Sequence, residues 1–222
     1  WFDGGWSGVL ARVISFGTAR YPDDVARRLR AVNIAAWLSA STMIIFVLKK
    51  PEHDPTTVSM ALCLVLAPLL HRYGSIAAAL LVLIVLYVQA YRITMLFGMG
   101  NGAVLAFLTV PVASVILLGL GRTYLSAVFA CLGVVCATYL QLTVADNTGV
   151  ASARLQSINF SVNFATNTLI LLILVVHMAR QTARAEAAAN REYLRSESLL
   201  TQILPAAVAA RLKDHTEAYI AD

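Results

Sequence analysis

Residues 158–204 read INFSVNFATNTLILLILVVHMARQTARAEAAANREYLRSESLLTQIL, an apolar run followed by a run of strong helix formers. Its first part, to residue 179, is apolar and as long as the roughly 20 residues that a membrane-crossing helix needs. From Arg180 the strong helix formers Ala, Glu, Arg and Gln follow, with no Gly or Pro before Pro205. We therefore predict one helix of about 45 residues, roughly 70 Å long, that leaves the membrane as a rigid cytosolic rod.

The composition of the whole chain indicates a membrane protein. Of its 222 residues, 59% are hydrophobic and 13% charged, and the mean hydropathy is +0.73. An ordinary soluble domain carries about 25% charged and roughly 45–50% apolar residues. These values exclude a water-soluble globular domain, a disordered chain and a collagen-like chain.

Apolar segments separated by short polar connectors predict an all-α membrane protein with six transmembrane helices. The second segment is short and contains Pro68, which we expect to kink it near its inner end. The six segments are Ala31–Leu48, Thr57–Leu70, Ser75–Phe97, Ala103–Leu118, Thr123–Val144 and Ile158–Ala179.

Positive charge near the helix ends predicts the orientation, because cytoplasmic loops carry an excess of Lys and Arg. With both termini on one side, that side holds Arg12, Arg20, Arg27, Arg28, Arg30, Arg72, Arg122, Arg180, Arg184, Arg191 and Arg195. The opposite side holds only Lys49, Lys50, Arg92 and Arg154. We therefore expect a multi-pass protein with both termini in the cytoplasm, and we interpret His71 and His177 at the inner ends as interfacial anchors.

The chain divides into four regions on these grounds. Residues 1–30 form a cytoplasmic tail, either a short interfacial helix or a disordered segment, with apolar Trp6, Val9, Leu10, Val13 and Phe16. Residues 31–179 form the six-helix membrane domain. Residues 180–213 form a cytosolic helical dimerisation segment, and residues 214–222 form a linker into a domain outside this chain.

Three asparagines recur every fourth residue in the sixth segment. Asn159, Asn163 and Asn167 stay within about 80° of one helix face. An amide in hydrocarbon needs a partner, and such interhelical hydrogen bonds contribute about 0.6–2 kcal/mol each. The stripe is either static glue to a neighbouring helix or a dimer mate, or a polar seam whose partners change when the connected rod moves.

A second polar candidate lies toward the outer end of the third segment. Arg92 is an ionisable residue inside an apolar run, which makes it a functional candidate by default. Asp146 and Arg154 on the last outer loop would complete an extracellular ligand pocket with it. The simpler interpretation is that Arg92 extends its side chain to the membrane surface.

The sequence gives little support for catalysis or metal binding by these residues. The sequence has no phosphate-binding glycine-rich loop, no nucleophile with a base, and no paired carboxylates on a helix face. The adjacent Glu52, His53 and Asp54 are more typical of a solvated loop than of a divalent-cation site. We predict no catalytic, cofactor-binding or metal-binding residue in this chain, and no nucleic-acid partner.

The rod carries apolar residues that need a partner helix. Tyr193, Leu200 and Ile203 fit one heptad seam, although Glu186 and Ser196 fall on it too. We therefore predict that two copies of this helix pair loosely in a parallel homodimer, and that each helix is broken at Pro205. The residues that we assign to this dimer helix and its end are Tyr193, Leu199, Leu200, Ile203, Leu204 and Pro205.

The stretch Glu197–Lys213, with its Leu-Leu-Thr-Gln-Ile-Leu-Pro core, resembles the segment just before the catalytic domain of class III nucleotide cyclases. The resemblance implies a transducing role for the dimer helix, because Leu199, Leu200, Ile203, Leu204 and Pro205 match the transducing segment of that family. The preceding spans, with Val25–Arg30 before the first and Leu69–Gly74 after the second, resemble the mycobacterial six-span adenylate cyclases. Receptor guanylate cyclases share a similar Leu-Leu-x-x-x-Leu-Pro segment, so this motif does not fix the purine.

The resemblance implies a bacterial plasma-membrane enzyme whose dimeric cytosolic domain converts ATP to cyclic AMP and pyrophosphate with Mg²⁺ or Mn²⁺. None of the family's metal-binding aspartates has a counterpart here, so we expect this portion alone to be inactive and to anchor, dimerise and sense an unknown extracellular ligand. One alternative is the sensor module of a histidine kinase, or of a diguanylate or guanylate cyclase. A small transporter is the other, although it would leave the rod unexplained.

Overall fold

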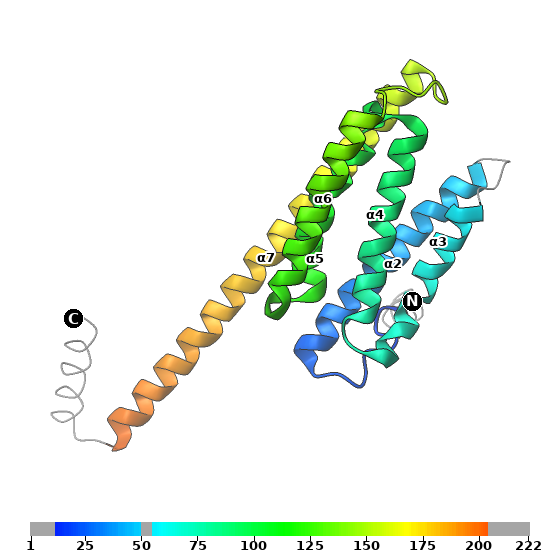
Figure 1. Cartoon of the computed structure of the whole chain (residues 1–222). Coiled ribbons are helices and arrows are strands. Elements are labelled where there is room, and N and C mark those ends of the chain that lie inside the picture. Colours follow the sequence, from blue (N-terminus) through cyan, green and yellow to red (C-terminus); the bar gives the residue numbers. More distant parts are fainter. Residues whose placement is uncertain (1–11, 50–54, 204–222) are drawn as a thin grey trace, which may run out of the picture. The chain divides into compact units, whose positions relative to one another are not determined.

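The computed structural model describes residues 12–49 and 55–203, and every regular element in these ranges is helical. Contacts divide the chain into two units, residues 1–174 and residues 175–222. Figure 1 shows the long helices of the first unit running up and down. They are α2 (Asp23–Lys49), α3 (Pro55–Leu66), α4 (Ala77–Phe97), α5 (Ala106–Leu118), α6 (Thr123–Thr143) and the first part of α7 (Ala153–Ile203).

Four short 3₁₀ helices join or extend these elements. Because proline at the start of a helix needs no backbone donor, Pro68 lies at the first positions of η1, where α3 gives way to a 3₁₀ helix rather than to a kinked α-helix. The four are η1 (Ala67–Tyr73), η2 (Met99–Asn101), η3 (Ala103–Leu105) and η4 (Leu120–Arg122).

Helix α4 is the centre of the first unit. It contacts α2, α3, α5 and α6, while α2 pairs with α3 and α5 pairs with α6. Small residues let helix backbones approach closely in membrane proteins, and Ala78 and Ala79 of α4 are fully buried. Large apolar side chains fill the rest of this core, including fully buried Leu64, Leu83 and Leu140.

Four helices among the described residues are long and apolar enough to cross a membrane: Pro55–Tyr73, Ala77–Phe97, Thr123–Thr143 and Ala153–Leu199. The fourth predicted span, Ala103–Leu118, is a shorter apolar helix whose first turn is η3. The first predicted span lies within α2, which begins at Asp23 inside the region predicted as tail. The prediction of an all-helical membrane protein is confirmed, whereas the number of six spans stays a prediction.

Helix α7 is continuous from Ala153 to Ile203, a length of 51 residues. It therefore contains both the sixth predicted span and the predicted rod without an interruption. The Gly- and Pro-free sequence explains this continuity, because no residue in it breaks the backbone hydrogen-bond ladder. The second unit, as far as the structure describes it, is the C-terminal part of this helix.

Candidate functional site

The asparagine stripe marks the half-buried face of α7 within the first unit. Asn159, Asn163 and Asn167 are half-buried. Apolar residues on other faces of the helix are each more than half exposed, among them Val162, Phe164 and Leu169. The spacing of four residues therefore orients the stripe as the sequence indicates.

Asn163 binds the loop that follows α4. Its side-chain amide donates to the main-chain oxygen of Asn101 at 2.9 Å. Asn101 is itself 1% exposed and immobilised, because its side chain accepts from the Ala103 amide at 2.7 Å and donates to the Ile93 carbonyl at 3.2 Å. The acceptor that meets α7 is therefore held at a fixed position at the end of α4.

Asn167 binds α5 one turn further along. Thr109 donates its hydroxyl to Asn167 Oδ1 at 2.6 Å, and the Asn167 amide donates to the Asn163 carbonyl at 2.8 Å. Both polar ends of the Asn167 side chain are thus satisfied. The Asn159 side chain, by contrast, has no hydrogen bond within the described ranges. The structure therefore brings two of the three predicted residues together with partners from other elements.

The end of the first unit where α4 finishes, which we call the η2 end, is closed by backbone hydrogen bonds. The Met99 amide donates to the Ala145 carbonyl at 3.1 Å, and the Gly100 amide donates to the Asp146 carbonyl at 2.9 Å. Gln156, in the first turn of α7, donates its side-chain amide to the same Asp146 oxygen. The loop after α6 is therefore fastened both to η2 and to the start of α7.

Asn101, Thr109 and Gln156 were not singled out by the sequence analysis. The glycine-rich stretch Gly98–Gly102 was the available signal, since its close backbone approaches need residues without a side chain. A Cβ atom at Gly98 would lie within 3 Å of the Asp146 carbonyl oxygen. Thr109 gave no sequence signal, because a threonine inside an apolar helix is ordinary.

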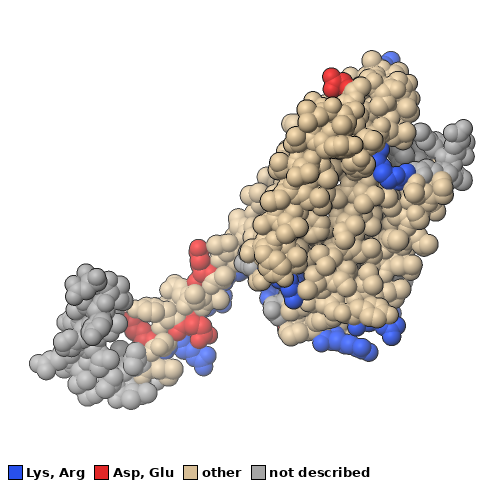
Figure 2. All heavy atoms as spheres, in the orientation of Figure 1, with Lys and Arg blue, Asp and Glu red and all other residues tan. Residues whose placement is uncertain are grey.

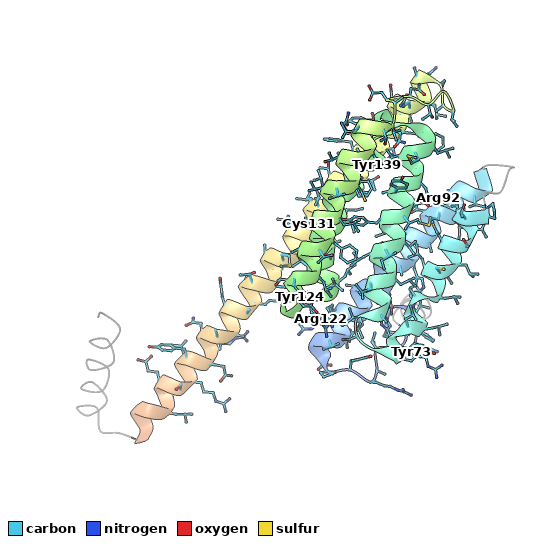
Figure 3. The ribbon with its side chains drawn as sticks, in the orientation of Figure 1. Tyr73, Arg92, Arg122, Tyr124, Cys131 and Tyr139 are labelled. Atoms are coloured by element: carbon cyan, nitrogen blue, oxygen red, sulfur yellow. The ribbon has the colours of Figure 1, made fainter. Side chains whose placement is uncertain are left out.

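The residues of the predicted extracellular pocket have different neighbours. Arg92 on α4 lies against α3, with Nη1 3.7 Å from Met60 Sδ, and Figure 3 shows its place on the helix. Asp146 and Arg154 are exposed, one in the loop after α6 and the other in the first turn of α7. The pocket stays a prediction. Among the described residues, no group of three His, Cys, Asp or Glu could hold a metal ion.

The opposite end of the first unit is rich in arginine. Figure 2 shows Lys and Arg side chains gathered there, and Figure 3 places Arg122 beside Tyr124 at this end. Arg28 on α2 donates to the Leu118 carbonyl of α5 at 2.6 Å, so the start of α2 and the end of α5 meet here. We call this end the arginine end.

The predicted transducing residues lie on the C-terminal part of α7 or beyond it. Tyr193 and Leu199 are 60% and 50% exposed, and Leu200 and Ile203 lie within the helix. Leu204 and Pro205 lie outside the described residues, as do Trp6, Val9, Leu10 and the Glu52–Asp54 cluster. Exposed apolar side chains on a helix of this length are typical of a face that binds a partner helix.

The described helices are apolar, and the last of them, α7, is 51 residues long; the family comparison places the chain among the membrane-associated sensor domains. The MASE7 family model matches residues 18–193, and the chain belongs to this family. The chain is also similar to proteins named adenylate cyclase from Mycobacterium bovis and Mycobacterium tuberculosis. In each case the identity is 32% over 212 residues and 92% of this chain.

The match covers only part of each relative. The matched region makes up 48% of each relative's length, so the chain spans about half the length of the curated relatives. The resemblance to the membrane portion of mycobacterial adenylate cyclases is thus confirmed.

Proposed function

We propose that this chain is the membrane anchor and transducer of a class III adenylate cyclase, an enzyme that converts ATP to cyclic AMP and pyrophosphate. The carrying observation is the continuity of α7, which joins the Asn163 and Asn167 contacts in the first unit to the predicted dimerisation segment. The name and length of the mycobacterial relatives support a catalytic region outside the 222 residues.

The transduction step follows from helix geometry. In an α-helix each residue is rotated by about 100° around the helix axis and advanced by 1.5 Å along it relative to the residue before. Because α7 is continuous, a rotation or shift imposed at Asn163 and Asn167 is carried to the residues further along the same helix. Two such helices paired through the seam of Tyr193, Leu200 and Ile203 would deliver that movement to both catalytic domains of a homodimer. An unknown extracellular ligand acting at the η2 end is the proposed stimulus, because the outer loop is fastened there to the start of α7.

The proposed orientation places the arginine end at the cytoplasmic face of the bacterial plasma membrane, with both termini in the cytoplasm. The distribution of Lys and Arg supports it, since cytoplasmic flanks carry the excess of positive charge. The metal ions that the reaction needs, Mg²⁺ or Mn²⁺, would be bound by the catalytic domain and not by this chain.

The test joins the native residues that follow Asp222 to this chain and assays membranes for cyclic AMP formed from ATP with Mn²⁺. The proposal expects robust production that the 222-residue chain alone does not give. A folded, dimeric extension that makes no cyclic AMP would overturn the proposal. Formation of cyclic GMP from GTP, or phosphorylation of a histidine, would identify another type of signalling enzyme.

A further inference from the structure

The arginine end contains a buried histidine that the proposed function does not use. His71 in η1 is 2% exposed, and its Nε2 atom lies 2.7 Å from Oδ1 of Asn33, which is fully buried in α2. This finding corrects the interpretation of His71 as an interfacial anchor, because an anchor would keep its polar tip at the surface.

Asn33 also holds the segment that precedes α2. Its Nδ2 atom donates to the Ile14 carbonyl at 2.9 Å and to the Phe16 carbonyl at 3.0 Å. Tyr21 donates its hydroxyl to the His71 carbonyl at 2.6 Å, so the same segment is tied to η1 by a second bond. We call residues 12–21 with Asn33 and His71 the N-terminal latch.

The close packing of the latch depends on Gly17. Its φ of +75° is a conformation that residues with a side chain rarely adopt. A Cβ atom there would lie 3.1 Å from the Pro68 carbonyl and 3.3 Å from the His71 ring. The backbone at Gly17 therefore packs close to His71, and a side chain at this position would press on the histidine.

The hydrogen bonds of Asn33 determine the state of the histidine. Because the Asn33 amide nitrogen donates to two carbonyls, the atom that faces His71 is the oxygen, which can only accept. His71 Nε2 must then carry a proton. In the neutral ring Nδ1 is the unprotonated atom, and Nδ1 is buried with no hydrogen-bond partner in the described part of the chain.

A proton added to Nδ1 of His71 would have no hydrogen-bond acceptor in this site. Protonation would place an N–H donor and a positive charge at Nδ1 in buried surroundings, which is costly without a paired group. No carboxylate among the described residues hydrogen-bonds to His71. On η1 the next residue, Arg72, is exposed and stacks over the Tyr73 ring at 5.7 Å.

The ionisable groups on the other packed elements do not compensate for it. On α2, Arg28 reaches the Leu118 carbonyl, Arg27 reaches the Asp23 carbonyl, and Arg30 and Asp23 are exposed. In the preceding segment Arg12 and Arg20 are exposed, and Tyr21 is bonded to a main-chain oxygen. Helix α4 has no ionisable residue before Tyr87, and Cys63 on α3 is exposed. Most of the charged side chains that the structure describes on these elements are therefore arginines, which do not compensate for a further positive charge.

We infer that the N-terminal latch is a proton-binding site, in which protonation of His71 at Nδ1 releases residues 12–21 from α2 and η1. Opening lets Nδ1 reach water or a carboxylate, so acid favours the open state. This property does not require the chain to belong to a cyclase, and it can be measured in the 222-residue protein.

The test measures hydrogen–deuterium exchange of the chain in lipid nanodiscs at about pH 7.5 and about pH 5, on either side of the ordinary histidine pKa of about 6.5. Protection factors, corrected for the intrinsic pH dependence of exchange, are compared for the amides of Phe16, Thr18 and Tyr21, which donate to main-chain carbonyls. We expect protection to fall about tenfold or more at the lower pH, since one pKa unit of coupling corresponds to a tenfold change. Protection at the start of α4 serves as the internal reference.

The matched variant is His71→Gln, whose amide can donate to Asn33 Oδ1 but cannot gain a proton. It should keep the latch closed at both pH values. Asn33→Leu should loosen it at both, with protection of α4 retained as the check of folding. Equal protection of the wild type at both pH values, or the same acid-induced loss in His71→Gln, would overturn the inference.

The tautomer gives an independent measurement. Nitrogen chemical shifts of a histidine-labelled chain, assigned by comparison with His71→Gln, should show the Nε2–H form near neutral pH. An Nδ1–H form for His71 would contradict the hydrogen-bond assignment and with it the proposed site.

Discussion

The hydroxyl of Thr109 on α5 donates to the side-chain oxygen of Asn167 on α7 across 2.6 Å. If it loses this partner, Thr109 still has the Leu105 carbonyl at 3.3 Å as an acceptor. Asn167 has no comparable second donor among the described contacts for its oxygen. Loss of the bond therefore leaves Asn167 without a donor but leaves Thr109 with an acceptor, and this difference can be tested by mutation.

Removing the two partners separately should give different losses of stability. We expect Thr109→Val to cost more than Asn167→Leu, because it leaves the amide oxygen of the half-buried Asn167 without a donor. The coupling energy in the double-mutant cycle should be about 0.6–1.7 kcal/mol, as for hydrogen bonds between transmembrane helices. Denaturation by SDS in mixed micelles measures it, with exposed Thr168→Val as the control. A coupling energy near zero would mean that the bond does not hold α7 on α5.

Gly133 on α6 permits the close approach of α5. A Cβ atom there would lie 2.8 Å from the Phe107 carbonyl oxygen and 2.8 Å from the Tyr87 hydroxyl. Phe107 precedes Pro111 by four residues, so its carbonyl lacks the amide donor that a non-proline residue would supply. The hydroxyl of Tyr87 in turn donates to the Phe129 carbonyl at 2.6 Å.

We therefore expect Gly133→Ala to destabilise the first unit by about 1–3 kcal/mol, the usual cost of overpacking a well-packed interior. The same denaturation assay measures this loss. Gly121→Ala is the control, since nothing lies within 4 Å of a Cβ atom at that position. An unchanged midpoint for Gly133→Ala would show that α5 and α6 can separate without cost.

The sequence predicted the long helices well because their signals are local. The continuity of α7 follows from the absence of Gly and Pro, and the stripe of Asn159, Asn163 and Asn167 follows from helical spacing. Each of these inferences needs only residues within one helix.

The partners of those residues could not be predicted, because they depend on tertiary contacts. Asn33 and His71 are 38 residues apart, and Thr109 and Asn167 are 58 apart. Helices that are apolar on all sides have no amphipathic pattern that would indicate which faces meet. His71 at the end of a span therefore had the sequence signature of an anchor, although the segment before α2 covers it.

The tight backbone contacts at the η2 end can be tested with two glycines that both have a positive φ. Gly98 and Gly149 have φ values of +91° and +83°, so an alanine at either position carries a backbone strain of about 1–3 kcal/mol. Only Gly98→Ala also places a Cβ atom against the Ala145 and Asp146 carbonyls.

Gly149→Ala should therefore cost only that strain, since nothing lies within 4 Å of a Cβ atom there. Gly98→Ala should cost more and should weaken the attachment of the loop after α6. Hydrogen–deuterium exchange of the Met99 and Gly100 amides, which donate to that loop, measures the attachment directly. Equal exchange in the two variants would indicate that the loop is not fastened to η2.

The continuity of α7 predicts a dependence of output on helical register. Inserting two residues after Arg195 should rotate everything beyond it by about 200°, because each residue contributes about 100°. In the complete protein, the proposed function predicts that cyclic AMP formation becomes insensitive to changes in the membrane region. Inserting seven residues is the matched control, since it lengthens the helix yet restores the register to within about 20°. A two-residue insertion with normal regulated activity would mean that α7 does not transmit rotation, whereas loss of regulation in both variants would point to length rather than register as the transmitted quantity.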